Sequence, residues 1–479
     1  MDQADDAVWV REIVARHNLI LRGSQTNIPG VYAGPIWYYW LSVGYFIFGG
    51  DPFGAVFLGV LRAVVLVGVL MWFLRGKIGE KKALLVGLFL SFFWWFYDTS
   101  RWSFNPFPVV TSVFVLLLLL IKFLEGRKKY FLWSAIPVFL NFSFEVAAAT
   151  SILFFYSVLT LWLWWKKKIN LKVVLITFAL PSLFLGYVVF VLGKIFIQKH
   201  TVGIYGTPTG YFSGTNFIYM IGRFMEMLSY AVFPYHIYIS SALFLGLFIL
   251  FFRQKKKNLF IKNFVLLSLV LTFCSWIFFS TNHGWYDWHT VYIPPILFVS
   301  VLLLVLTLPK KFAVVALLLV VWFQYPIFSS RYLQYNSIQE GPGILSTQLK
   351  VIDWIYTYND GDGFNVYTYM PARRDYPYQY LIWWWGLKKY KFLPCEYSIS
   401  PRDLKLYVPG KQYYSKPTLG CDRLVFLIIE PDAYDDEYYK GWYQRRGVGT
   451  VLLEKATIGE VNVEKRRYMT KQELEREKK

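Results

Sequence analysis

The sequence predicts a mainly α-helical polytopic membrane protein, a helix bundle of about ten spans followed by a small α/β domain. Three observations predict this fold class. Hydrophobic residues make up 56% of the 479 residues and aromatic residues 21%, which is far more apolar than a soluble chain of this length. Long apolar runs recur between residues 51 and 330 and alternate with short basic connections. Beyond residue 330, helix and strand patterns alternate.

Residues 1–50 are expected to form an extracytoplasmic loop that ends in an interfacial helix. The loop opens with three carboxylates, Asp2, Asp5 and Asp6. Residues 36–48 are apolar and rich in Trp and Tyr, but they are too few to cross a bilayer core, which needs roughly 20 helical residues. Because Trp and Tyr favour the membrane interface, this segment is expected to lie there.

Residues 51–330 are expected to form the transmembrane bundle. The expected spans are 53–74, 83–97, 107–121, 146–165, 171–196, 232–252, 264–280, 291–308 and 312–328, with a further helix from Tyr130 to a turn at 141–145. Every second connection is rich in Lys and Arg, which the positive-inside rule places in the cytoplasm. These connections are 75–82, 122–129, 166–172, 253–262 and 309–311. The other connections, among them a long loop at 197–230, then face outside.

This orientation places the first residues outside the membrane. Residues 1–35 contain no apolar core of the kind that a signal peptide needs. We therefore expect that an upstream helix is missing and that the intact protein has about eleven spans in the plasma (inner) membrane. The net charge of +20 is explained by the basic connections, so no nucleic-acid partner is expected.

Residues 331–479 are expected to form an extracytoplasmic α/β domain. The patterns predict helices at 349–358 and 378–389 and strands at 364–369 and 423–430. The tail, 464–479, is expected to be a solvated helix or disordered. The sequence leaves open whether Cys395 and Cys421 form a disulfide or remain two thiols.

Charged residues gather in the connections that are expected to face outside. Cations beside carboxylates at a membrane surface are costly unless they bind something, and a lipid phosphate fits this combination. A phosphate leaving group needs cations but no protonation, whereas an attacking hydroxyl needs one carboxylate base. These residues therefore predict inverting sugar transfer from a polyprenyl-phosphate donor. The motifs that carry this pattern are Asp2-Gln3-Ala4-Asp5-Asp6, Gly34-Pro35-Ile36-Trp37, Gly49-Gly50-Asp51-Pro52 with Arg62, Arg101 to Pro106, and Trp288-His289 to Pro295.

In this order, the motifs resemble the GT-C glycosyltransferases, in particular the family 39 group that includes protein O-mannosyltransferases and aminoarabinose transferases. The resemblance implies that Asp2 or Asp6 is the general base. We expect outward-facing cations to bind the donor phosphate, with Arg101, His289 and Arg223 as the candidates. Glu145, Asp5 and Tyr292 are expected to support the site, and Tyr292 fits the late loop of the family. Two positions depart from the family: Gln3 replaces the usual Glu, and Gly34 replaces a basic residue.

The expected partners are the lipid donor, membrane lipids and an extracytoplasmic acceptor, which is a lipid, a polysaccharide or a protein. No cofactor is expected, and no metal site, because His283, Asp287 and His289 fall in a short turn without helical i, i+4 spacing.

Other interpretations remain open. Asp5 and Asp6 could cap a helix that begins near Ala7, and Arg101 could anchor the interface. The chain could also be a transporter or flippase of a lipid-linked substrate, or a non-catalytic scaffold of the same fold. Few charges within the expected spans and the lack of a visible repeat favour the enzyme over a transporter.

Overall fold

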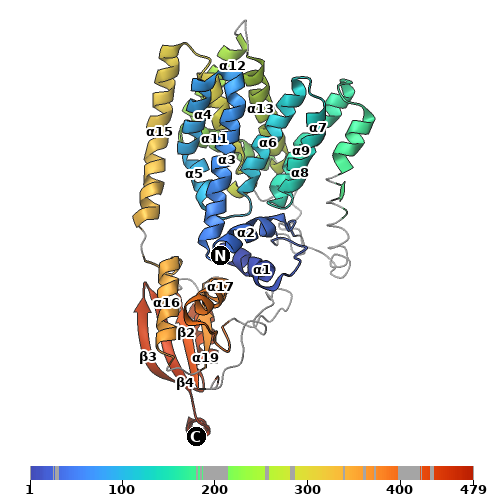
Figure 1. Ribbon diagram of the computed structural model, residues 1–479. Helices are drawn as coiled ribbons and strands as arrows, with labels where there is room; N and C mark the ends of the chain where they lie inside the picture. Colours follow the sequence, from blue (N-terminus) through green and yellow to red (C-terminus); the bar gives the residue numbers. More distant parts are fainter. Residues whose placement is uncertain are drawn as a thin grey trace. The chain divides into compact units, whose positions relative to one another are not determined.

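The computed structural model shows two compact units, each of which is described by itself (Figure 1). We call residues 20–44 and 53–332 the membrane unit, and residues 1–19, 45–52 and 333–479 the terminal unit. Residues 1–50, expected as one segment, contribute to both units. The structure describes residues 2–24, 26, 32–179, 182–183, 186, 214–253, 258–280, 286–337, 340–359, 363–371, 374–397, 421, 423–431 and 436–477.

Helices make up the membrane unit. In chain order they are α2 (Ile36–Ile47, whose last turn belongs to the terminal unit), α3 (Phe53–Ile78), α4 (Glu80–Phe92), α5 (Trp94–Arg101), α6 (Pro108–Leu124), α7 (Lys129–Trp133), α8 (Ala135–Asn141), α9 (Val146–Trp165), α11 (Gly214–Ala231), α12 (Ile237–Arg253), α13 (Leu259–Ser280), the short 3-10 helix η1 (Asp287–Thr290), α14 (Ile293–Val305) and α15 (Lys310–Ser337, whose last turn also belongs to the terminal unit). At 12 residues, α2 is shorter than a span, as the sequence predicts.

Within the described residues, four helices are long and apolar enough to cross a membrane: α3, α9, α13 and α15. The pair α4 and α5 meets the same criterion as a broken span with a bend of 64°. The bend lies at Phe93, whose backbone is extended. The helices α6, α12 and α14 are apolar but shorter. The length and apolar composition of these helices are those of a multi-pass membrane protein. The total of about ten spans stays a prediction.

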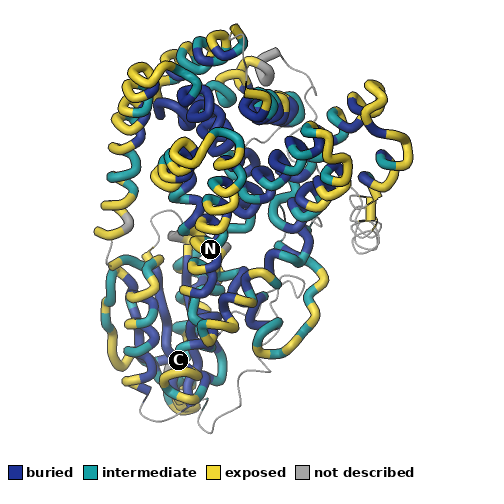
Figure 2. Tube along the Cα trace, turned by 45° about the horizontal axis from the view of Figure 1, so that its top comes forward, coloured by how far each residue is buried: buried dark blue, intermediate teal, exposed yellow. Residues whose placement is uncertain are grey.

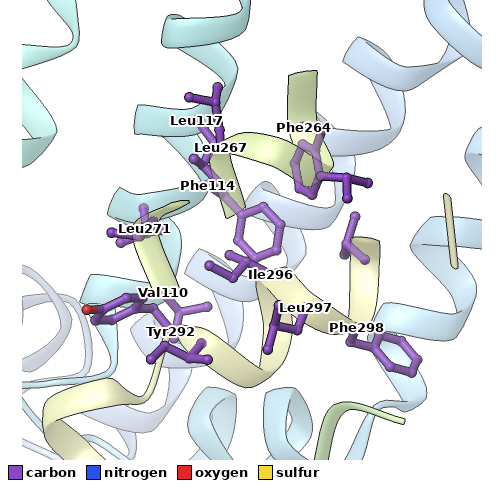
Figure 3. Close-up of a cluster of buried hydrophobic side chains, with 14 of the residues drawn as sticks. Val110, Phe114, Leu117, Phe264, Leu267, Leu271, Tyr292, Ile296, Leu297 and Phe298 are labelled. Atoms are coloured by element: carbon purple, nitrogen blue, oxygen red, sulfur yellow. The ribbon is translucent and has the colours of Figure 1, made fainter. Parts of the chain in front are cut away.

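Side chains from α6, α13 and α14 form the centre of the bundle (Figure 3). Every residue of α14 is buried, which is expected of a helix that is apolar on all sides. The ring of Phe114 on α6 lies 6.4 Å from that of Phe264 on α13. By contrast, only 17% of the most apolar stretch of α15 is buried, so this helix is suited to face lipid. Figure 2 shows buried residues in blue and exposed residues in yellow.

The basic connections meet at one end of the membrane unit, which lies at the top of Figure 1. Lys77 pairs with Glu125 at 2.5 Å, and its carbonyl accepts from Asn258 at 3.0 Å. Lys82 donates to the Leu306 carbonyl at 2.9 Å. The polar turns meet at the opposite end. The alternation of connections that the sequence predicts is therefore present, and which end faces the cytoplasm stays a prediction.

Two expectations for loops are wrong. Residues 214–230, expected in a long loop, belong to α11, because Met220 and Met227 lie on one helical face and are buried. The rest of that loop and residues 187–196 lie outside the described part. Residues 2–16, expected in a loop, form helix α1 (Asp2–Arg16), which packs against α17 (Tyr376–Trp385) within the terminal unit.

The terminal unit contains the expected α/β domain. Its sheet has the order β1 (Phe364–Tyr369), β2 (Leu424–Ile429), β4 (Val461–Tyr468) and β3 (Thr450–Ile458). β1 and β2 are parallel and the other pairs antiparallel. The helices α16 (Leu345–Thr357) and α19 (Asp436–Gly447) pack against the sheet, and the π-helical turn η2 (Gly386–Tyr390) follows α17. Cys395 and Cys421 form a disulfide with a Cα–Cα distance of 5.9 Å.

The tail differs from its expected form. Residues 464–468 belong to strand β4 of a hairpin, whereas residues 471–477 form the short helix α20 (Lys471–Glu477). The charges of β4 can be buried because they have partners: Arg466 donates to Glu464 at 2.7 Å and to the Thr450 hydroxyl at 2.7 Å.

Candidate functional site

The turn between α8 and α9 is the centre of the polar end of the membrane unit. The amide of Gly34 donates to the Phe142 carbonyl at 2.9 Å, and the Asn105 side chain donates to the Phe144 carbonyl at 2.8 Å. Segments that are far apart in the sequence, before α2 and after α5, are thereby fastened to one turn. Glu145 ends this turn.

Glu145 is the N-cap residue of α9, and its side chain accepts a hydrogen bond from the Ala147 amide at 3.2 Å. Burial raises the pKa of Glu145 to about 7, while this hydrogen bond acts in the opposite direction. Its Oε1 lies 4.0 Å from Nε2 of His289, which is 9% exposed. The structure therefore brings together two of the predicted site residues.

His289 is held in place by aromatic neighbours. Its ring stacks on Phe279 with a centroid distance of 5.7 Å and meets the rings of Tyr286 and Trp288 edge-on. A polar ring in an aromatic setting offers a cation or hydrogen-bond donor at a fixed place. Such a donor can bind an anionic group.

Tyr292, predicted as a supporting residue, lies three residues after His289 at the entrance to α14. Its hydroxyl is within 2.9 Å of the Ser151 hydroxyl and 2.7 Å of the Ser275 hydroxyl. These bonds join α9, α13 and the start of α14, and Figure 3 shows Tyr292 beside the hydrophobic cluster. Tyr292 is fully buried, so its place is structural and it positions the segment that carries His289.

Arg101 ends helix α5. Its guanidinium donates to the Tyr97 hydroxyl and lies 4.8 Å from the centre of that ring. The same helix is held by Arg62 of α3, which donates to the Thr99 carbonyl at 2.9 Å, and by Asp98, which lies 3.6 Å from Arg331. Arg62 belongs to one of the sequence motifs, and the structure gives it the role of fixing the end of α5.

The positive charge of Arg223, a residue predicted to bind phosphate, is balanced by two carboxylates. It pairs with Glu226 at 2.5 Å and also with Asp287. Glu226 accepts in turn from the Tyr230 hydroxyl at 2.5 Å. Burial raises the pKa of Asp287, with Arg223 opposing this shift. Since two acidic groups surround one guanidinium, this cluster carries no surplus positive charge for a phosphate.

The carboxylates of α1 lie in the terminal unit. Asp6 is buried, and its charge adds to burial in raising the pKa of Tyr45 above its usual value. Asp5 similarly adds to the effect of burial that raises the pKa of Tyr376 to about 12. Asp2 lies in the first turn of α1, and its side chain is outside the described part. Because α1 begins at Asp2, the interpretation of Asp5 and Asp6 as caps of a helix from Ala7 is wrong.

Sequence reasoning did not single out Glu12, the acidic residue of a second group of charges on α1. Arg11 and Glu12 are both buried, 3.6 Å apart, and Arg16 pairs with Glu12 at 2.9 Å. Arg11 also lies 5.7 Å from the centre of the Trp383 ring, which packs with α1 in this unit. The i, i+4 spacing of Glu12 and Arg16 is a signal that could have revealed the pair.

The described residues contain no group of three or more His, Cys, Asp or Glu side chains that could hold a metal ion. His283 lies outside them. Among the described residues, the polar end thus contains cations, carboxylates and aromatic rings. They come from the end of α5, the turn between α8 and α9, the second half of α11, and η1.

Comparisons with known proteins identify the fold. No family model and no curated protein matches the sequence. Two crystal structures of ArnT from Cupriavidus metallidurans are similar, each over 97% of this chain and 93% of that chain at 12% identity. The structure bound to undecaprenyl phosphate gives a TM-score of 0.57 and the apo structure 0.59. The resemblance to the GT-C fold that the sequence predicts is confirmed at the level of the fold.

Proposed function

We propose that this chain is an integral membrane glycosyltransferase that uses a sugar linked to a polyprenyl phosphate. The observation that carries the proposal is the fold, which over 97% of the chain is similar to that of ArnT bound to undecaprenyl phosphate. Fold alone is compatible with several activities. The polar end of the membrane unit supports the transferase activity, because cations lie there among aromatic rings. This end is opposite to the one that carries the basic connections.

In this proposal, the donor phosphate binds at Arg101 and His289. The first lies at the end of α5 and the second between α13 and α14, where Glu145 and Tyr292 fix its surroundings. Arg223 is a weaker candidate for the phosphate because Glu226 and Asp287 compensate its charge. We assign it instead to holding α11 against η1.

The chemical step needs one base. A carboxylate of α1 removes the proton from the acceptor hydroxyl or amine, whose oxygen or nitrogen attacks the anomeric carbon. The bond between that carbon and the phosphate oxygen breaks, and its electron pair leaves with the lipid phosphate. Attack opposite the leaving group inverts the anomeric centre. Asp2 and Asp6 are the candidates for the base, and Asp5 is a further carboxylate in the same part of the helix.

The test is turnover in liposomes. The full-length protein is reconstituted with a panel of polyprenyl-phosphate sugars and acceptors, and both the free lipid phosphate and the anomeric configuration of the product are measured. Inverted product with stoichiometric lipid phosphate supports the proposal. Asp2→Asn, Asp5→Asn and Asp6→Asn then locate the base, since its loss lowers the rate by about 100-fold or more.

Other outcomes assign other functions. Movement of an intact donor between leaflets without cleavage would identify a flippase. Donor binding without cleavage for every acceptor would identify a non-catalytic scaffold. Either result would contradict the proposed transfer reaction.

A further inference from the structure

A basic pocket lies at the end of the membrane unit opposite the candidate site. It has a volume of 490 Å³ and is lined by Lys128 before α7, by Trp164, Lys167 and Lys168 at the end of α9, and by apolar side chains that include Phe123 and Leu171. We call it the lysine pocket. Neither the fold comparison nor the proposed reaction accounts for it.

The backbone of Lys167 shows that a lysine at this place has a cost. Helix α9 ends in a Schellman motif, in which the amide of Lys168 donates to the Leu163 carbonyl at 2.9 Å and that of Lys167 to the Trp164 carbonyl at 2.8 Å. Lys167 has a φ of +53°, a conformation that favours glycine. A non-glycine residue in this conformation is a reason to look for a function of its side chain.

The neighbouring connection provides an internal comparison. Helix α6 ends in the same way, with the amide of Gly126 donating to the Phe123 carbonyl at 2.9 Å and that of Arg127 to the Lys122 carbonyl at 3.2 Å. Here the left-handed position, with a φ of +94°, is occupied by the usual glycine. Of these two turns, the one whose left-handed residue lines the pocket therefore has a lysine at that position, and the other has a glycine.

The charge of the lysine pocket is not neutralised by the described carboxylates. Across the described ranges, no ion pair involves Lys128, Lys167 or Lys168. Glu125, the acidic residue close by in the sequence, pairs with Lys77 at 2.5 Å and with Lys122 at 3.5 Å. Three ammonium groups around one cavity therefore attract an anion.

The surroundings point to a lipid as the source of that anion. Exposed Trp162, Trp164 and Trp165 form an aromatic belt at the end of α9, which is typical of the level of lipid headgroups. Exposed Leu171 and the ring of Phe123 add an apolar wall beside the lysines. Basic pockets between transmembrane helices are suited to anionic headgroups, and the cytoplasmic leaflet carries such lipids.

We propose that the lysine pocket binds the phosphate headgroup of an anionic phospholipid at the basic end of the bundle, in a site separate from that of the lipid donor. The phosphate contacts Lys128, Lys167 and Lys168, and the acyl chains lie along the apolar wall. Zwitterionic lipids, which carry no net charge, bind less well.

The test measures lipid binding to the full-length protein in detergent. Native mass spectrometry follows retention of phosphatidylglycerol against phosphatidylcholine, with inorganic phosphate as a competitor. In the triple variant Lys128→Gln, Lys167→Gln, Lys168→Gln, we expect affinity for phosphatidylglycerol to fall at least about tenfold. A matched triple variant of exposed cations outside the pocket, Arg75→Gln, Lys81→Gln, Lys310→Gln, removes the same charge and is expected to retain affinity within about twofold.

A single substitution separates binding from folding. Lys167→Gly relieves the left-handed backbone, so its melting temperature is expected to equal or exceed that of the wild type while affinity for phosphatidylglycerol falls. Wild-type affinity for phosphatidylglycerol in both this variant and the pocket triple variant would overturn the proposal. Displacement of the lipid by millimolar inorganic phosphate would assign the pocket to a free anion and would also overturn it.

Discussion

Glu145 is the residue whose ionisation most directly affects the proposed phosphate site. Its carboxyl has a pKa of about 7 because of burial, and it lies 4.0 Å from His289. As pH rises through 7, the carboxylate gains a negative charge beside the phosphate. Donor affinity is therefore expected to fall by about threefold to tenfold between pH 6 and 8. The sugar-linked donor is a phosphodiester, so its own charge is constant in this range.

Binding of the donor to Glu145→Gln checks this expectation. The variant is expected to bind at pH 8 more tightly than the wild type and to show a smaller pH dependence. Glu80→Gln, which removes an exposed carboxylate at the start of α4, serves as the control. A steeper pH dependence in Glu145→Gln than in the wild type would contradict the assignment.

The same pKa has a consequence for stability. The pKa of Glu145 is higher in the folded state than its usual value of 4.5. Its contribution to folding stability is therefore fully present below pH 4.5 and is lost as pH rises through about 7. The free energy of unfolding of the wild type is thus expected to decrease over this window relative to that of Glu145→Gln. Thermal unfolding at pH 5 and pH 8 measures the difference, and parallel profiles would show that Glu145 is ionised throughout.

Tyr292→Phe tests the structural role of the buried hydroxyl. The two serines that it contacts also bond carbonyls of their own helices, Ser151 that of Ala148 and Ser275 that of Leu271. They are therefore not left without partners, and the expected loss of stability is about 1 kcal/mol. Thermal unfolding in detergent measures this loss. A loss above about 4 kcal/mol would show that the hydroxyl does more than bridge these helices.

The sequence indicated candidate site residues, but it did not indicate all of the side chains that they contact. Glu145 was predicted because an unpaired charge between two apolar helices is costly, whereas His289 and Tyr292 were predicted from the family resemblance of their motif. The ion pairs that balance the charge of Arg223 were not predicted. Glu226 lies one turn away and could have been found from the i, i+3 spacing, but Asp287 reaches Arg223 only through the tertiary fold.

At the scale of elements, the close approach of α3 and α5 positions Arg101. A Cβ atom on Gly59 would lie 2.7 Å from the Ser100 carbonyl oxygen, which is backbone and cannot rotate away. Gly59→Ala is therefore expected to shift α5 and to raise the KM for the donor. In the same helix, Gly68 has nothing within 4 Å of its Cβ position, so Gly68→Ala is the matched control.

Kinetics of the two variants measure this difference. Gly68→Ala is expected to keep the KM of the wild type and to gain up to about 1 kcal/mol of stability from the better helix former. An unchanged KM in Gly59→Ala would show that α5 moves without affecting the donor site, and would contradict the role assigned to Arg101.

Elements with a simple apolar pattern were predicted closely, and those whose burial depends on distant partners were not. The bounds of α9 and β1 agree with the sequence prediction to the residue. Helix α11 was missed because its polar residues suggested a loop, although Met220 and Met227 are buried. Strand β4 was missed because Glu464, Lys465 and Arg466 are charged, and only the fold supplies the partners that allow their burial.

At the scale of the whole molecule, the membrane unit has a basic end and a polar end, and we predict that the basic end is cytoplasmic. A cysteine in place of Trp102, an exposed residue of the polar end, is expected to react with a membrane-impermeant maleimide added outside intact cells. A cysteine in place of Lys310 is expected to react only after permeabilisation. The reverse pattern would place the candidate site in the cytoplasm and contradict an extracytoplasmic reaction.

The central claim is that cleavage of a polyprenyl-phosphate sugar depends on the polar end of the bundle. The most direct measurement is the rate of lipid-phosphate release in liposomes for the wild type, His289→Gln and Arg75→Gln, the last of which removes an exposed cation at the basic end. We predict a loss of about 100-fold for His289→Gln and no loss for Arg75→Gln. Equal rates for the wild type and His289→Gln, or equal losses in both variants, would contradict the assignment of the donor phosphate to this site.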